Sequence, residues 1–159
     1  MLFGRTDEPP DPSTVDIRRI LLASEGRPIQ PSAVDFVVSL AHPAKASVHV
    51  ISIARVWGTS LGFPNPGLLP TRQEWDEQRK SVTAAVRSLE RRGVQAGGRV
   101  LATRRATRGI VREAERLGCD AIVMTADARR SRVLADLMWS QEPYRVRRRA
   151  RVPVYLVPS

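Results

Sequence analysis

The residues best suited to chemistry lie at the ends of two short apolar runs. Glu25 and Gly26 follow the run at residues 20–23, and Thr125 follows the run at residues 121–124. Each run is short and apolar throughout, which predicts a strand buried on both faces. A buried strand that leads through a loop into a helix directs unpaired backbone N–H groups at an anion. The sequence therefore predicts an anion-binding crevice at these strand ends.

The loop after the second run supplies the other candidate ligand residues. It is rich in arginine and ends at Ser140, a residue type that starts helices. A helix from Gln141 to about Ala150 would direct its first N–H groups toward the loop. The candidate ligand-binding residues are Glu25, Gly26, Thr125, Ala128, Arg129, Arg130, Ser140 and Gln141.

Positive charge is concentrated near the C-terminus. The chain has a net charge of +10, and residues 129–151 contain eight arginines against Asp136 and Glu142. Such a segment either meets phosphate, nucleic acid or an acidic partner, or is a solvated helix face. Trp139 and Tyr144 are the only aromatic residues near it, and no groove-reading motif occurs, so nucleic acid is the weaker alternative.

Catalytic and metal-binding motifs are missing from the sequence. It contains no P-loop, G-x-S-x-G, H-E-x-x-H or paired Cys-x-x-Cys. Cys119 has no histidine close in sequence and is expected to be a small core residue. His49 lies in an apparent strand without a neighbouring carboxylate, and Glu113 and Glu115 are spaced to face different sides of a helix. We expect neither an enzyme nor a metal site.

Apolar periodicity and capping residues predict the elements that hold these residues. Strands are expected near residues 20–23, 47–54, 99–103, 121–124 and 152–157, helices near 31–41, 71–92, 107–117 and 141–150, and a loop at 58–70. Thr71, Thr107 and Ser140 are the predicted N-caps, and Gly93 and Gly118 the stops.

Alternating strands and helices predict an α/β fold. The expected architecture is a five-stranded doubly wound parallel sheet of flavodoxin-like order 3-2-1-4-5, with helices on both faces. The first and fourth strands are then neighbours at the switch point, so Glu25 lies beside Thr125.

Length and composition fit one domain. The 159 residues divide into an N-terminal arm, residues 1–15 with three prolines, and a single domain over residues 16–159. One cysteine excludes an internal disulfide, and no run approaches the roughly 18 apolar residues of a membrane span. These features predict a cytoplasmic protein.

Three fragments in this order resemble the universal stress protein family: ILLASEG, GCDAIVM and the closing RVPVYLV. The resemblance covers residues 17–158. It implies a non-catalytic stress-response domain in which the acidic residue after the first strand contacts a ribose or a metal. It also implies a Gly-x2-Gly-x9-Gly-Ser/Thr loop around nucleotide phosphates. Glu25 matches the acidic position.

The glycine loop of the family is missing here. Counted forward from Met124, its first two glycine positions hold Thr125 and Ala128, and its Gly-Ser pair falls on Met138 and Trp139. Counted back from Pro153, the pair falls on Ser140 and Gln141. Side chains then occupy the space of the phosphates, and Trp139 is large enough to fill part of the cleft. We therefore expect a stress-response module without the family's ATP binding and with no cofactor. The alternative is an ATP- or AMP-binding switch that uses the crevice between Glu25 and Ser140.

The last strand is the expected dimer contact. Pro153 donates no backbone hydrogen bond, which predicts an edge strand or pairing that starts after it. The resemblance implies a homodimer through this edge, formed by Val154, Tyr155, Leu156 and Val157. Other expected partners are a protein or a small anionic ligand. A second alternative is nucleic acid bound by the helix at residues 145–151.

Overall fold

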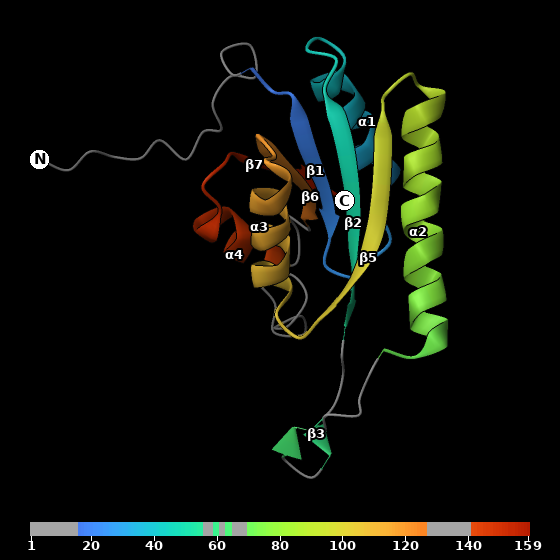
Figure 1. The fold of residues 1–159 in the computed structure, drawn as a ribbon, viewed down its shortest axis with the longest axis vertical. Helices are drawn as coiled ribbons and strands as arrows, with labels where there is room; N and C mark the ends of the chain where they lie inside the picture. The colour runs from blue at the N-terminus through green and yellow to red at the C-terminus, as the bar shows by residue number, and fades with distance from the viewer. Residues whose placement is uncertain (1–15, 56–58, 61–62, 65–69, 127–140) are drawn as a thin grey trace, which may run out of the picture.

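A five-stranded parallel sheet forms the centre of the molecule (Figure 1). The computed structural model describes residues 16–55, 59–60, 63–64, 70–126 and 141–159. The strands of the sheet are β1 (Arg19–Ser24), β2 (Ser47–Arg55), β5 (Ala96–Thr103), β6 (Ala121–Ala126) and β7 (Val154–Pro158), in the order β5-β2-β1-β6-β7. Counting only these strands, the order is 3-2-1-4-5, which confirms the predicted doubly wound sheet.

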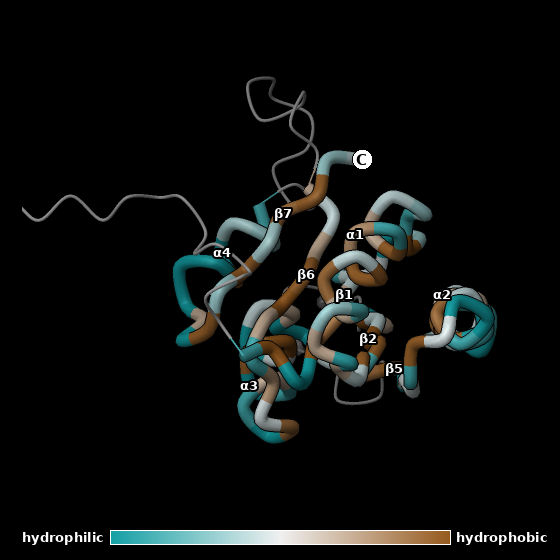
Figure 2. The backbone as a smooth tube through the Cα atoms, turned by 90° about the horizontal axis from the view of Figure 1, so that it is seen from above, coloured by the Kyte–Doolittle hydropathy of each residue, from teal (hydrophilic) through white to brown (hydrophobic). Residues whose placement is uncertain are grey.

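Helices cover both faces of the sheet (Figure 2). On one face lie α1 (Pro31–Ala41) and α2 (Arg72–Arg91), and on the other lie α3 (Ala106–Leu117) and α4 (Glu142–Arg149). Alternate residues of each strand enter two separate cores: Leu22 packs with the first pair of helices and Leu21 with the second. This two-sided burial explains why the central strands are continuous apolar runs.

Capping residues in the sequence predicted several helix ends correctly. The Thr71 hydroxyl oxygen accepts a hydrogen bond from the Glu74 N–H at 3.1 Å, the predicted N-cap of α2. The Glu74 carboxylate accepts from the Arg55 N–H instead of from Thr71, so it ties α2 to the end of β2. Gly118 ends α3 in the left-handed region, at φ +63°, which glycine adopts without strain.

Two helix starts differ from the prediction. Thr103 Oγ1 accepts the Arg105 N–H, and α3 begins at Ala106, so Thr107 lies inside the helix and is not its cap. Its hydroxyl is free of the backbone and donates a hydrogen bond to Glu142 in α4. The N-cap of α4 is Gln141, one residue beyond the predicted position.

Two further differences concern strands. Within the predicted loop at 58–70, the structure has a short antiparallel pair, β3 (Thr59–Ser60) and β4 (Phe63–Pro64). The predicted edge strand β5 lies at an edge but starts three residues earlier than expected, because Gly97 and Gly98 pair with β2 despite their weak strand preference. None of the helices in the described ranges is long and apolar enough to cross a membrane.

Candidate ligand crevice

The carboxyl ends of β1 and β6 meet as predicted. Ala23 pairs with Met124 in the parallel register, so Glu25 and Thr125 reach the same edge of the sheet. A cavity of about 30 Å³ lies there. It is lined by Leu22, Ala23, Ser24, Glu25, Arg27, Pro28, Ile29, Gln30, Thr125 and Ser159.

Arg27 occupies the polar part of this cavity. Its Nε donates a hydrogen bond to Oε1 of Glu25 at 2.5 Å, and its Nη2 donates to the Thr125 carbonyl oxygen at 3.3 Å. The Glu25 residue is only 2% exposed. A buried carboxylate needs a charged or hydrogen-bonding partner, and Arg27 supplies both. Glu25 is therefore already satisfied from within the chain.

The turn that carries this ion pair is fixed by its own hydrogen bonds. Gly26 has φ +119°, outside the range that other residues readily adopt. The Ser24 hydroxyl donates to the Arg27 carbonyl oxygen and accepts from the Gly26 N–H. A backbone bent in this way brings the Arg27 side chain back over Glu25.

Side chains from β2 and α2 donate hydrogen bonds to the same turn. The Gln78 amide of α2 donates to the Gly26 carbonyl oxygen at 2.9 Å and accepts from the Ser52 hydroxyl of β2. The Arg55 Nε donates to the Glu25 carbonyl oxygen at 3.1 Å. The position of Arg27 is thus supported from β2 and α2, so moving it out of the crevice disturbs a connected network.

The crevice in this conformation is small. A volume of about 30 Å³ equals the share of one water in the liquid, whereas small-molecule pockets measure about 300–1,000 Å³. Between the described residues there is room for a water molecule beside Arg27. This volume is far below what a nucleotide occupies.

The other predicted ligand residues are only partly placed. Ala128, Arg129, Arg130 and Ser140 lie outside the described residues, as does Trp139, which was expected to fill part of the cleft. Gln141 is exposed as the N-cap of α4. The sequence analysis did not include Arg27 among the crevice residues. The spacing of Glu25-Gly26-Arg27, an acid and a base two residues apart with a glycine between them, could have indicated this ion pair.

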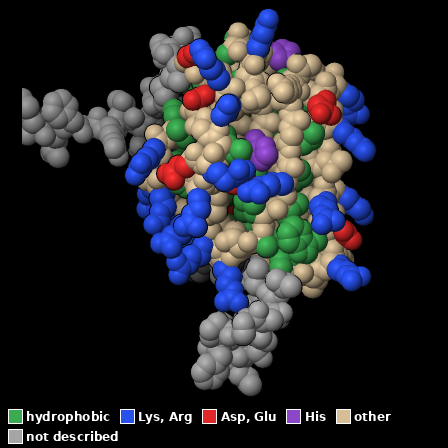
Figure 3. Space-filling view, viewed as in Figure 1, with side chains coloured by type: hydrophobic (Ala, Val, Ile, Leu, Met, Phe, Trp, Pro, Cys, Tyr) green, Lys and Arg blue, Asp and Glu red, His purple; other side chains and the backbone are tan. Residues whose placement is uncertain are grey.

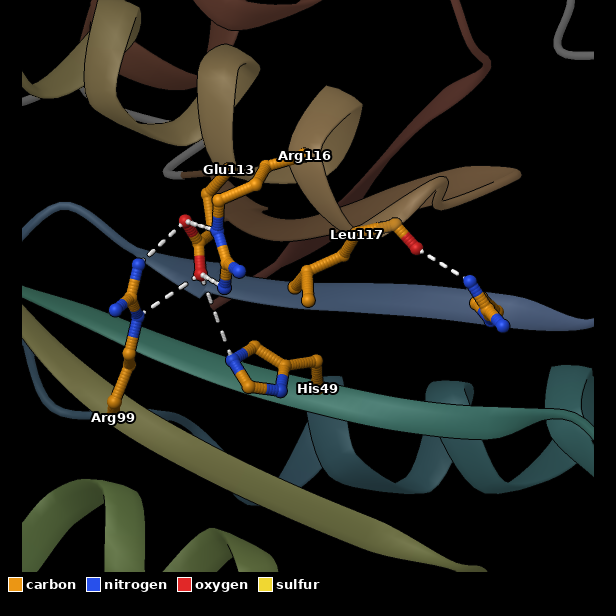
Figure 4. A network of polar contacts seen from close by, with 6 residues as sticks. His49, Arg99, Glu113, Arg116 and Leu117 are labelled. Atoms are coloured by element: carbon orange, nitrogen blue, oxygen red, sulfur yellow. Dashed lines mark hydrogen bonds and ion pairs between the residues drawn. The ribbon is translucent and has the colours of Figure 1, made fainter.

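A second polar cluster surrounds Glu113 on the α3 face (Figure 4). Arg99 of β5 donates two hydrogen bonds to the Glu113 carboxylate, at 3.0 and 2.8 Å, and Arg116 donates two more at the same distances. The hydrogen bonds from Arg116 and then Arg99 outweigh burial and lower the pKa of Glu113 to about 2. Four donated hydrogen bonds leave this carboxylate no free role as a base.

His49 of β2 lies beside this cluster. Its Nε2 is 3.8 Å from Glu113 Oε1, too far for a hydrogen bond, and is buried without a partner. Burial lowers the pKa of His49, opposed by the charge of Glu113. The expectation that no carboxylate lies near His49 is wrong, because Glu113 is distant in sequence and is brought close by the packing of α3 on the sheet.

The surroundings of Cys119 and Asp120 suit structural roles. Cys119 is buried, and burial raises the pKa of its thiol to about 11, which disfavours the reactive thiolate. Asp120 accepts hydrogen bonds from the N–H groups of Arg18 and Arg19 at 2.9 and 3.0 Å, as expected for a residue at a strand start. Within the described parts of the chain, no three acidic, histidine or cysteine side chains are grouped to hold a metal.

The sheet order and its switch-point crevice define a doubly wound α/β domain. The chain belongs to the universal stress protein family, whose sequence profile matches residues 16–158. No curated protein matches the sequence.

Solved structures share this fold. A universal stress protein family member from Burkholderia pseudomallei is 23% identical, with a TM-score of 0.66 over 91% of this chain and 98% of that one. The universal stress protein of Archaeoglobus fulgidus in complex with dAMP is 16% identical, with a TM-score of 0.64 over 90% of this chain and 99% of that one. A family protein from Arabidopsis thaliana with AMP bound is 10% identical, with a TM-score of 0.57 over 89% of this chain and 91% of that one.

Proposed function

We propose that this chain is a non-catalytic stress-response module that works as a dimer and does not bind ATP in the manner of nucleotide-binding relatives. The observation that carries the proposal is the ion pair of Arg27 with Glu25 inside a cavity of about 30 Å³. The acidic side chain that the family resemblance assigns to a ribose or metal is taken by a cation of the same turn. A nucleotide must break this pair and desolvate both groups before it gains contacts.

The alternative is an adenine-nucleotide switch. In its favour, proteins of similar fold were solved with dAMP and AMP. Glu25 also follows β1, where the family resemblance implies an acidic residue. This alternative requires Arg27 to swing away and a loop without glycines to accommodate phosphates. The two functions therefore differ in what Arg27 does.

Calorimetry with adenosine, AMP and ATP separates these alternatives. We expect no heat of binding to the native protein at ligand concentrations of about 1 mM. Replacing Arg27 by Ala frees Glu25 and enlarges the cavity, so adenosine should bind this variant more tightly than it binds the native protein. The matched control is Arg91→Ala in α2, which removes an arginine away from the crevice. Binding of ATP or AMP to the native protein tighter than about 100 μM would contradict the proposal.

The dimer part of the proposal rests on the open edge of β7. Among the described strands, β7 pairs only with β6. The Pro153 carbonyl oxygen accepts from the Ile122 N–H and the Ser159 N–H donates to Ala126, so odd-numbered residues of the strand direct their backbone groups at β6. Val154 and Leu156 direct theirs at the open edge, where a second copy can pair.

The side chains of β7 also pack inside this chain. Val154, Tyr155 and Val157 are buried in the cores of this chain, and Leu156 is partly buried against one of them. Contact with a second copy therefore rests on backbone hydrogen bonds more than on these four side chains. A dimer formed in this way extends the sheet across a two-fold axis.

A further inference from the structure

An open groove between α3 and α4 is lined mostly by arginine. Its volume is about 640 Å³, within the range of small-molecule sites. The lining residues are Arg104, Arg105, Ala106, Thr107, Arg108, Glu142, Arg145, Arg148 and Arg149. None of them lines the crevice at Glu25. In Figure 3, basic side chains gather on the side of the molecule where Figure 1 places α3 and α4.

Both helices direct a group of arginines at this groove. Arg145, Arg148 and Arg149 have the three- and four-residue spacing of one helix face, and Val146 is buried against the sheet on another face of α4. The facing wall is the start of α3, with Arg105 and Arg108. Guanidinium groups on two walls can grip one anion from both sides.

The walls are held in place independently of the arginines. The Thr107 hydroxyl of α3 donates a hydrogen bond to the Glu142 carboxylate of α4, and Glu142 is only 8% exposed. Arg145 Nη1 lies 3.5 Å from the other oxygen of Glu142. Glu142, the one acidic residue among the described lining residues, thus joins the helices and pairs with Arg145.

Four of the lining arginines are not paired with other side chains in the described part of the chain. The side chains of Arg105, Arg108, Arg148 and Arg149 make no hydrogen bond or ion pair with described residues. Arg105 also provides no side-chain cap to α3, so N–H groups of the first turn remain open beside the groove. Like charges crowded without partners raise the free energy of the empty protein, and a bound anion removes that cost.

We propose that this groove binds a compact ligand with several phosphate groups. Arg105 and Arg108 on one wall and Arg148 and Arg149 on the other match several negative charges, and planar guanidinium groups pair with phosphate oxygens two at a time. None of the described residues that line the groove is aromatic and able to stack on a base, which favours a small polyphosphorylated ligand over an oligonucleotide. The site is separate from the crevice, so it stands whether or not a nucleotide binds beside Glu25.

Titration calorimetry with inorganic tripolyphosphate at about 150 mM salt tests the site. We expect a dissociation constant below about 100 μM, and binding of inorganic monophosphate at least about tenfold weaker. A weaker constant for tripolyphosphate, or equal affinity for the two anions, would overturn the proposal.

Charge-matched variants locate the binding. Arg108→Gln with Arg148→Gln removes one arginine from each wall and should weaken tripolyphosphate binding by about tenfold or more. Arg87→Gln with Arg91→Gln removes the same charge from α2, outside the groove, and should change the affinity by less than about twofold. Equal losses in the two double variants would mean non-specific attraction and refute the site.

Three further measurements complete the test. The double variant Arg105→Gln with Arg149→Gln also removes one arginine from each wall. It should show the same loss of tripolyphosphate affinity, and it replaces the first double variant if that one misfolds. Arg27→Ala should leave tripolyphosphate binding unchanged, which separates the groove from the crevice. A single-stranded oligonucleotide that binds through the groove arginines about tenfold more tightly than tripolyphosphate would replace the small ligand by nucleic acid.

Discussion

The imidazole of His49 and the carboxylate of Glu113 lie 3.8 Å apart across the packing contact between β2 and α3. Glu113 is held as a carboxylate by Arg99 and Arg116, whereas His49 is kept from charging by burial. Two titratable groups thus sit side by side with the pKa of each moved below its ordinary value. Because each pKa is lowered in the folded state, each group makes the protein less stable as pH falls, His49 as pH falls through 6.5 and Glu113 as it falls from 4.5 toward 2.

Glu113→Gln should destabilise the protein near neutral pH. The folded-state pKa of about 2 lies below the ordinary value of 4.5, so the carboxylate contributes stability above pH 4.5 that is lost as pH falls toward 2. A shift of this size corresponds to roughly 3 kcal/mol. Urea unfolding should show this loss at about pH 7 and a smaller one at about pH 3. Glu115→Gln, at an exposed position of the same helix, should cost less than about 0.5 kcal/mol. A loss independent of pH would contradict this assignment.

His49→Gln should make stability less dependent on pH just below neutrality. The pKa of His49 is lowered from 6.5 in the folded state, so the unfolded chain binds the proton more readily. The native protein therefore loses stability as pH falls through 6.5, and the variant should lose less. Urea unfolding at about pH 7.5 and 5.5 measures the difference. An NMR titration that places the His49 pKa above 6.5 in the folded protein would show that Glu113 outweighs burial.

Gly98→Ala should destabilise the contact of α2 with the sheet. A Cβ at this position would lie 2.6 Å from Val82 Cγ1 and 2.7 Å from the Val50 carbonyl oxygen, and the backbone oxygen has little freedom to move. We expect a loss of about 1–3 kcal/mol in the free energy of unfolding. Gly97→Ala is the control, because a Cβ there meets nothing within 4 Å. Equal effects of the two substitutions would mean that α2 does not approach β5 so closely.

Leu156→Pro should convert the proposed dimer into a monomer. Proline removes the N–H that Leu156 directs at the open edge of β7 and is tolerated where a strand faces solvent. Leu156→Val keeps the N–H and should remain dimeric. Light scattering coupled to size-exclusion chromatography gives the mass of each. A native protein that is monomeric, or a Leu156→Pro variant that is folded and still dimeric, would refute pairing through this edge.

Many features of the fold follow from short stretches of sequence. Residues 20–23 and 121–124 are apolar throughout because both faces of a central parallel strand are buried, and each run is a strand in the structure. Gly118 ends α3 because the left-handed conformation there suits glycine. Alternation of strands and helices then leaves few allowed topologies, so the sheet order and the meeting of Glu25 with Thr125 could be predicted.

Other features depend on which side chains the folded chain brings together. The Arg27 side chain folds back on Glu25 because Gly26 has a positive φ and Gln78 and Arg55 hold the turn, and residue types alone do not specify that conformation. Glu113 meets Arg99 through the packing of α3 on β5.

The sequence by itself determined the strands of the central sheet, their order and the edge at which Glu25 and Thr125 meet, because burial on two faces leaves continuous apolar runs in the sequence. Only the tertiary structure decided that Arg27 fills this crevice and that arginines from α3 and α4 line one groove. Those arginines are separated by more than thirty positions, and their distance in space is set by helix docking through Thr107 and Glu142. Contacts of that kind depend on side-chain conformations and on packing between elements, which no local pattern records.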